Sequence, residues 1–193
     1  MDATRRGSAL VWATRPRSVD LRDNRVVTVR AARTSDVDAL ALMHGRCAPD
    51  TLYGRYQNAA PPVSRTWQRR LLSTELALVA FDRKRLVALA NLSPRDGGSA
   101  ELSVLVEDAF QGVGLGRALA RQVAATARLL GYRRLVVMVV RSALAARNLL
   151  ATIGPAVVVD GADGDPVAVL QLGMDVLGGL PDPDAVGTRQ VAG

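Results

Sequence analysis

Three glycines, Gly112, Gly114 and Gly116, stand at alternate positions between an apolar, β-branched run and a helix-like pattern. Glycine lets backbone N–H groups approach a ligand without a Cβ in the way. The first turn of a helix also attracts anions, because its dipole and its unpaired N–H groups favour negative charge. These residue types and their spacing predict a site that holds a diphosphate mainly through main-chain groups.

Two common nucleotide-binding motifs do not fit this segment. No Gly-Lys-Ser/Thr ending follows the glycines, which excludes a Walker-type loop, and the spacing Gly112-Val-Gly114-Leu-Gly116-Arg117 is not that of the Rossmann fingerprint. Arg117 stands where neither motif requires a cation. The structural alternative is that the glycines only form a tight turn between a strand and a helix.

The segment resembles the acyl-CoA-binding motif of the GCN5-related N-acetyltransferases, a strand followed by Gln-x-x-Gly-x-Gly/Ala and a long helix. Here the motif reads Gln111-Gly-Val-Gly114-Leu-Gly116, and Arg117 opens the helix. An acidic turn and an aromatic residue precede the motif, in the family's order. The resemblance is to bacterial members, and the arginine- and alanine-rich composition suggests an actinobacterial source.

The resemblance implies an α/β fold with a mixed, mostly antiparallel sheet of six to seven strands, flanked by helices and splayed at its central strands. Hydrophobic periodicity and turn residues give the family's order of elements over about residues 26–174. We expect strands at 25–30, 75–81, 86–92, 100–106, 134–140, 156–160 and 166–174, a turn at 94–98, and helices at 36–47, 52–56, 64–72, 118–130 and 142–152.

Composition divides the chain into three parts. Residues 1–24 are polar and arginine-rich, which predicts a disordered N-terminal lead-in. Residues 25–175 would form the N-acetyltransferase domain. Residues 176–193 are rich in Gly, Pro and Asp, and we expect a flexible C-terminal tail.

Charge and apolar content restrict the class of protein. No apolar run reaches the roughly 18 residues of a membrane span, and no signal peptide is recognisable, so we expect a cytoplasmic protein without membrane attachment. Cys47 is the only cysteine, which agrees with a reducing compartment. The net charge is +7, but the arginines are scattered rather than clustered, and we do not expect nucleic-acid binding. Exposed strand edges would allow a homodimer.

Acetyl transfer from a thioester to an amine needs a neutral amine and a donor for the carbonyl oxygen as it becomes negative. The resemblance implies acetyl-CoA as co-substrate, no metal, and direct transfer to a primary amine of a small molecule or a protein lysine. Glu101, at the start of the central strand, is the candidate catalytic base. The implied cofactor contacts are Val104, Leu105, Val106, Gln111, Gly112, Val113, Gly114, Leu115, Gly116 and Arg117.

The end of the family pattern departs from the usual one. Many relatives carry an Asn, a Tyr that protonates the leaving thiolate, and a Phe, where this chain has Ala143, Leu150 and Pro155. The sequence therefore names no general acid. The second hypothesis is accordingly a non-catalytic acyl-CoA-binding sensor or regulatory module.

Several other reactive or aromatic side chains have simpler explanations. His44 is the only histidine and has no Cys pair, so we expect no metal site there. Cys47 has no recognisable partners that would make it a nucleophile. Tyr53, Tyr56 and Trp67 are expected to pack rather than to bind a ligand.

Overall fold

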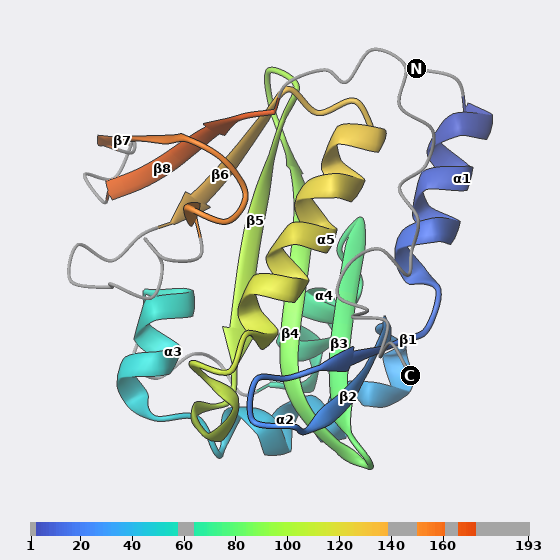
Figure 1. Ribbon diagram of the computed structural model, residues 1–193, viewed down its shortest axis with the longest axis vertical. Coiled ribbons are helices and arrows are strands. Elements are labelled where there is room, and N and C mark those ends of the chain that lie inside the picture. Colours follow the sequence, from blue (N-terminus) through green and yellow to red (C-terminus); the bar gives the residue numbers. More distant parts are fainter. Residues whose placement is uncertain (1–2, 58–63, 139–149, 161–165, 173–193) are drawn as a thin grey trace, which may run out of the picture.

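The computed structural model describes residues 3–57, 64–138, 150–160 and 166–172. One sheet runs through these residues in the strand order β1-β2-β3-β4-β5-β6-β8-β7, and of its neighbouring pairs only β5 and β6 are parallel (Figure 1). The strands are β1 (Arg17–Asp20), β2 (Val26–Ala31), β3 (Leu76–Asp82), β4 (Arg85–Arg95), β5 (Ser99–Val106), β6 (Arg134–Met138), β7 (Ala156–Asp160) and β8 (Pro166–Gln171). The helices are α1 (Ala3–Thr14), α2 (Val37–His44), α3 (Pro49–Tyr56), α4 (Arg65–Leu72) and α5 (Leu115–Leu129), with short 3-10 turns η1 (Thr34–Asp36) and η2 (Asp108–Phe110).

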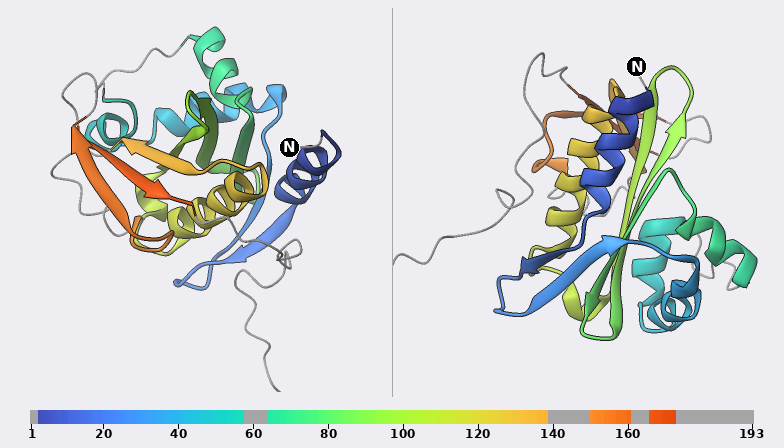
Figure 2. Two further views of the ribbon diagram at one scale, coloured as in Figure 1. Left: turned by 90° about the horizontal axis from the view of Figure 1, so that it is seen from above. Right: turned by 90° about the vertical axis from the view of Figure 1, so that its right-hand side faces the viewer.

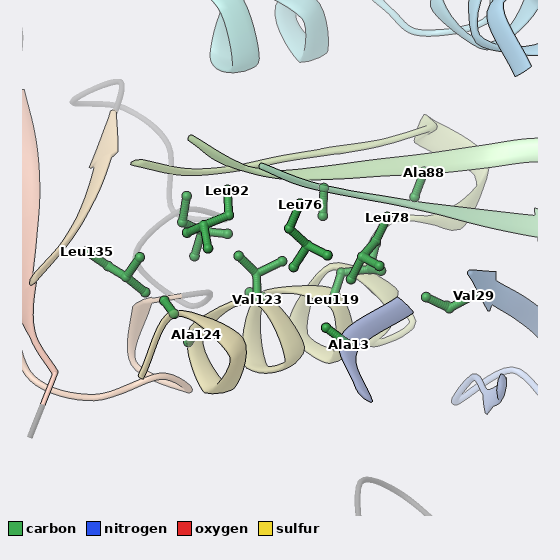
Figure 3. Packing of buried hydrophobic residues seen from close by; sticks show 14 of the residues in the cluster. Ala13, Val29, Leu76, Leu78, Ala88, Leu92, Leu119, Val123, Ala124 and Leu135 are labelled. Carbon is green, nitrogen blue, oxygen red and sulfur yellow. The ribbon is translucent and has the colours of Figure 1, made fainter. Parts of the chain in front are cut away.

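Helices cover both faces of the sheet. Helices α1 and α5 lie on one face, and α2, α3 and α4 lie on the other (Figure 2, right). Leu115, Leu119 and Val123 recur at helical spacing along α5 and are fully buried. Figure 3 shows Leu119 and Val123 between α5 and the sheet. On the opposite face, Leu40 and Met43 of α2 are fully buried in a second apolar cluster. None of the helices in the described ranges is long and apolar enough to cross a bilayer.

The predicted mixed α/β fold is confirmed, with eight strands rather than six to seven. The extra strand is β1, which pairs with β2. The expectation of a disordered lead-in over residues 1–24 is corrected, because residues 3–14 form α1 and residues 17–20 form β1. Ala9 and Ala13 are buried against α5, and Gln122 of α5 donates a hydrogen bond to the Ala13 carbonyl at 2.6 Å. Long-range packing, which local periodicity does not report, therefore orders this segment.

The expected turn at 94–98 begins later than predicted, because β4 continues through Pro94 to Arg95. Where β4 meets the end of β5, the Glu107 N–H donates to the Val87 carbonyl. Hydrogen-bonded and non-hydrogen-bonded pairs alternate along an antiparallel ladder, so Pro94 and Ala100 form a non-hydrogen-bonded pair. On the other side, the pairing of β3 with β4 ends at Leu92. The N–H that proline lacks is therefore not required by either neighbouring strand.

The central strands splay apart, as predicted. β5 and β6 pair only over three residues, from Ser99 opposite Arg134 to Glu101 opposite Val136. Beyond Glu101, β5 runs on beside β4 alone and β6 pairs with β8, so that β6 diverges from β5 (Figure 1). The predicted final hairpin is also confirmed, since β7 and β8 are antiparallel. Residues 139–140, most of the predicted helix 142–152, and the predicted tail 176–193 lie outside the described residues.

Candidate active site

The glycine-containing corner lies between β5 and α5, as the sequence predicts. Gly112 has a φ of +74° and Gly114, the N-cap of α5, has a φ of +99°. Residues with a side chain rarely adopt this left-handed conformation, so glycine is required at both positions. No side chain caps the N-terminus of α5. The N–H groups of its first turn therefore have no side-chain acceptor there, an arrangement that suits a phosphate oxygen.

Side-chain hydrogen bonds fix the approach to this corner. Gln111 Nε2 donates to the Val106 carbonyl at 3.0 Å and to Thr51 Oγ1 at 3.1 Å. Thr51 in turn donates to Asp108 Oδ1 at 2.7 Å, and the Ala48 N–H donates to Asp108 Oδ2 at 2.9 Å. Gln111 therefore ties the loop to β5 and to α3.

A buried carboxylate anchors the other end of the loop. The Glu107 side chain is only 2% exposed, and it accepts from Arg46 Nε at 2.9 Å and from Arg85 Nε at 3.3 Å. Arg46 also donates to the Leu86 carbonyl at 2.7 Å. These bonds connect the start of the loop to the residues after α2 and to the start of β4.

One cation beside the corner was not predicted. The Arg22 N–H, in the turn between β1 and β2, donates to the Val113 carbonyl at 3.0 Å. The Arg22 side chain is exposed and passes 3.9 Å from where a Cβ on Gly114 would stand. The sequence carried no signal for this contact, because residues 1–24 were expected to be disordered.

Only part of the predicted β5 main chain faces the gap beside β6. In the β4–β5 ladder, Leu105 and Leu89 form a hydrogen-bonded pair, so the main-chain N–H and carbonyl of Leu105 point toward β4. The main-chain groups of Val104 and Val106 alternate with these and point into the gap. The bond from Gln111 to the Val106 carbonyl agrees with this direction.

Glu101 lies at the last paired position before β5 and β6 separate. Its side chain is 23% exposed, and Oε2 accepts from Arg95 Nε at 3.0 Å and from Arg95 Nη2 at 2.5 Å. Glu101 and Leu105 share one face of β5 because side chains two residues apart point the same way. Leu105 packs in the cluster with α2, so this face of Glu101 is the one covered by α2, α3 and α4.

A second polar group reaches this face from α3. Arg55 Nη2 donates to Asn91 Oδ1 at 3.2 Å, and Asn91 is 1% exposed. Asn91 of β4 lies opposite Ser103 of β5. Glu101 lies two residues before Ser103 on the same strand, opposite Ser93. Sequence patterns gave no reason to select Arg55 among the many arginines.

His44, Tyr56 and Trp67 form an aromatic cluster between α2, α3 and α4. His44 Nε2 and the Tyr56 hydroxyl are hydrogen-bonded at 2.7 Å, and the ring centroids of Tyr56 and Trp67 are 5.0 Å apart. Burial lowers the pKa of His44 to about 4 and raises the pKa of Tyr56 to about 12. The packing predicted for Tyr56 and Trp67 is confirmed, whereas Tyr53 is 46% exposed.

Other reactive groups are held in inert settings. Burial, with the nearby Asp108 and Glu107, raises the pKa of the Cys47 thiol to about 12, so this thiol is a poor nucleophile. Leu150, at the family's tyrosine position, is 5% exposed in the core under α5. Ala143 lies outside the described residues. Within the described ranges, no three His, Cys, Asp or Glu side chains are grouped as a metal site.

A glycine corner at the start of a long helix, next to two strands that separate, is the arrangement that the resemblance implied. Residues 42–154 match the model of the acetyltransferase (GNAT) family. The chain belongs to this family. Its matched segment includes Glu101, the glycine corner and all of α5. No curated protein sequence matched the chain.

Solved structures of other GNAT proteins share the fold. The GNAT domain of S. lividans PAT is 23% identical, with a TM-score of 0.74, over 84% of this chain and 98% of that chain. The structure of yncA from Salmonella typhimurium with its cofactor acetyl-CoA is 22% identical, with a TM-score of 0.58, over 80% and 97%. A phosphinothricin acetyltransferase from Sinorhizobium meliloti, in complex with acetyl-CoA, is 18% identical, with a TM-score of 0.61, over 78% and 90%. At these identities the likeness concerns the fold.

Proposed function

We propose that this GNAT protein is an acetyl-CoA-dependent N-acetyltransferase that moves an acetyl group directly to a primary amine. The observation that carries the proposal is the uncapped N-terminus of α5 behind two left-handed glycines, beside the gap between β5 and β6. The acetyl-CoA bound to the relatives from Salmonella and Sinorhizobium supports this choice of co-substrate.

The main chain would provide most contacts to the co-substrate. The N–H groups from Gly112 to Arg117 would hold the pyrophosphate, and the half-buried Arg117 would add positive charge. Gln111 would contribute indirectly, because its hydrogen bonds to Thr51 and to the Val106 carbonyl hold the glycine-containing loop in position. Val104 and Val106, rather than Leu105, would present main-chain groups to the thioester end, where an N–H can stabilise the developing oxyanion.

Acetyl-CoA supplies an activated acetyl group. The neutral amine attacks the carbonyl carbon, a C–N bond forms, the C–S bond breaks, and coenzyme A leaves as a thiolate that takes up a proton. Glu101 would accept the proton that the amine loses, directly or through a water molecule, because its partly exposed carboxylate lies where the strands separate. Arg95 orients this carboxylate.

A second candidate function is a non-catalytic acyl-CoA-binding module, which the burial of Leu150 favours. A tyrosine at that position would be the usual proton donor for the thiolate. A thiol with a pKa of about 8.5 can leave without an acid, and a positioned acid typically contributes about two to four orders of magnitude in rate. Slow catalysis is therefore compatible with Leu150.

The test has two stages. Thermal unfolding with acetyl-CoA, coenzyme A and longer acyl-CoAs should show a concentration-dependent rise in Tm, because these ligands bind only the folded protein. Thiol release should then be measured over a panel of amines and lysine-containing proteins. Glu101→Gln should keep the Tm response and lower kcat. Unchanged turnover would remove Glu101 from the mechanism, and binding without transfer across the panel would favour the sensor.

A further inference from the structure

Arg55 is an arginine of α3 whose guanidinium is partly buried and forms no ion pair with any carboxylate of the described residues. Its Nε is buried and has no hydrogen-bond partner among the described residues, and its Nη2 donates to Asn91 Oδ1 at 3.2 Å. The guanidinium carbon lies 4.7 Å from the centroid of the Tyr56 ring. Burial lowers the pKa of Arg55, because a desolvated cation is destabilised.

Two other partly buried arginines of the described chain, Arg30 and Arg46, are neutralised, whereas Arg17 on β1 also has a buried nitrogen without a partner. Arg30 makes two hydrogen bonds of 2.8 Å to the two Asp36 oxygens, and Arg46 pairs with Glu107. The charge of Glu101 raises the pKa of Arg55, but Glu101 lies beyond ion-pair distance from it and is already paired with Arg95. Of the segments outside the described residues, 58–63 and 139–149 contain no Asp or Glu, whereas 1–2, 161–165 and 173–193 each contain at least one Asp.

The contact between Arg55 and Asn91 is well defined. Asn91 Nδ2 donates to the Leu71 carbonyl at 2.7 Å and to Thr74 Oγ1 at 3.0 Å, which directs Oδ1 at the guanidinium. Asn91 lies opposite Ser103, and Glu101 is two residues from Ser103 along β5. Two residues of a strand span about 7 Å, and Asn91, Ser103 and Glu101 share one face of the sheet, so the Arg55 guanidinium and the Glu101 side chain approach the same face.

We propose that Arg55 binds the carboxylate of the acceptor, so that the acceptor is a small amine carrying a carboxylate a few bonds from its nitrogen. This inference rests on the proposed transferase function and names its substrate class. A carboxylate would provide a counter-charge and would accept hydrogen bonds from the Arg55 guanidinium, which can donate two parallel N–H groups to one carboxylate. The amine of the same molecule would then lie toward Glu101, at the point where β5 and β6 separate.

The binding arm of the test does not depend on turnover. The protein, saturated with coenzyme A, is titrated with glycine, β-alanine and 4-aminobutyrate, and with the amide of each, at constant ionic strength, and Tm is recorded. The variants are Arg55→Met and Arg55→Lys. Arg17→Met is the matched control, because Arg17 also has a buried, unpartnered nitrogen but lies on β1, at the far edge of the sheet.

At least one acid should raise the Tm of the wild type and of Arg17→Met, and its amide should not. Arg55→Met should lose this response, and Arg55→Lys should keep part of it. The proposal is overturned if acid and amide act alike, if no acid acts on the wild type, or if Arg55→Met responds like the wild type.

The kinetic arm separates this inference from the proposed function. Thiol release from acetyl-CoA should show kcat/KM about ten- to hundredfold higher for the best acid than for its amide, the range expected for a hydrogen bond to a charged group. Arg55→Met should reduce that ratio toward one, with kcat for the amide retained. An equal loss for acid and amide would assign Arg55 a structural role and overturn the proposal. If acetyl-CoA binds but no amine is acetylated, the transferase function fails, and the Tm series still decides whether Arg55 binds a carboxylate.

Discussion

Acid should weaken this protein through His44, its only histidine. The imidazole is 3% exposed, packs against Tyr56 and Trp67, and has a pKa lowered by burial from 6.5 to about 4. Between these two values the unfolded chain binds a proton that the folded protein does not. Stability therefore falls as the pH falls through this window.

The size of the effect follows from the two pKa values. Between pH 7 and pH 4.5, the linkage relation gives a loss of about 2–3 kcal/mol in the free energy of unfolding from His44 alone. A domain of this size changes its Tm by about 2–4 °C per kcal/mol, so the expected drop is about 5–10 °C. The same protonation would place a charge against the Tyr56 side chain of α3, next to Arg55.

Thermal melts from pH 4.5 to 7 should be compared for the wild type and His44→Gln, which keeps a polar group toward the Tyr56 hydroxyl but does not titrate. Carboxylates contribute to both curves, so the difference between them isolates the histidine. One imidazole resonance should titrate in the NMR spectrum of the folded protein, with a midpoint near pH 4. A midpoint near 6.5, or parallel melting curves for the two proteins, would refute the reasoning.

Two further substitutions test the glycine corner and its anchor. Gly114→Ala should cost about 1–2 kcal/mol, because a side chain is strained at a φ of +99°, and should weaken coenzyme A binding in calorimetry; Gly7→Ala, in an open position of α1, should leave binding unchanged. Glu107→Gln should lower the Tm by several degrees, because Arg46 and Arg85 lose a buried charged acceptor worth about 1–3 kcal/mol, and an unchanged Tm would show that these pairs are replaced by water at no cost.

The sequence alone determined the features that depend on local chemistry. Apolar runs of period two and of helical spacing placed most strands and helices, because burial of one face imposes those periods. Glycine at 112 and 114 is needed for a left-handed backbone, and that need is visible in the residue type itself. The order of elements then led to the fold and to the glycine corner.

Tertiary structure alone decided which polar groups meet. Nothing local indicates that Arg22 lies beside Gly114, that Arg95 holds Glu101, or that Arg55 contacts Asn91 but forms no ion pair with the carboxylates of the described residues. These partners are far apart in the chain or hidden among many similar arginines. Order in residues 3–20 likewise comes from packing α1 on α5 and pairing β1 with β2, because short segments gain their stability from distant surfaces rather than from their own propensity.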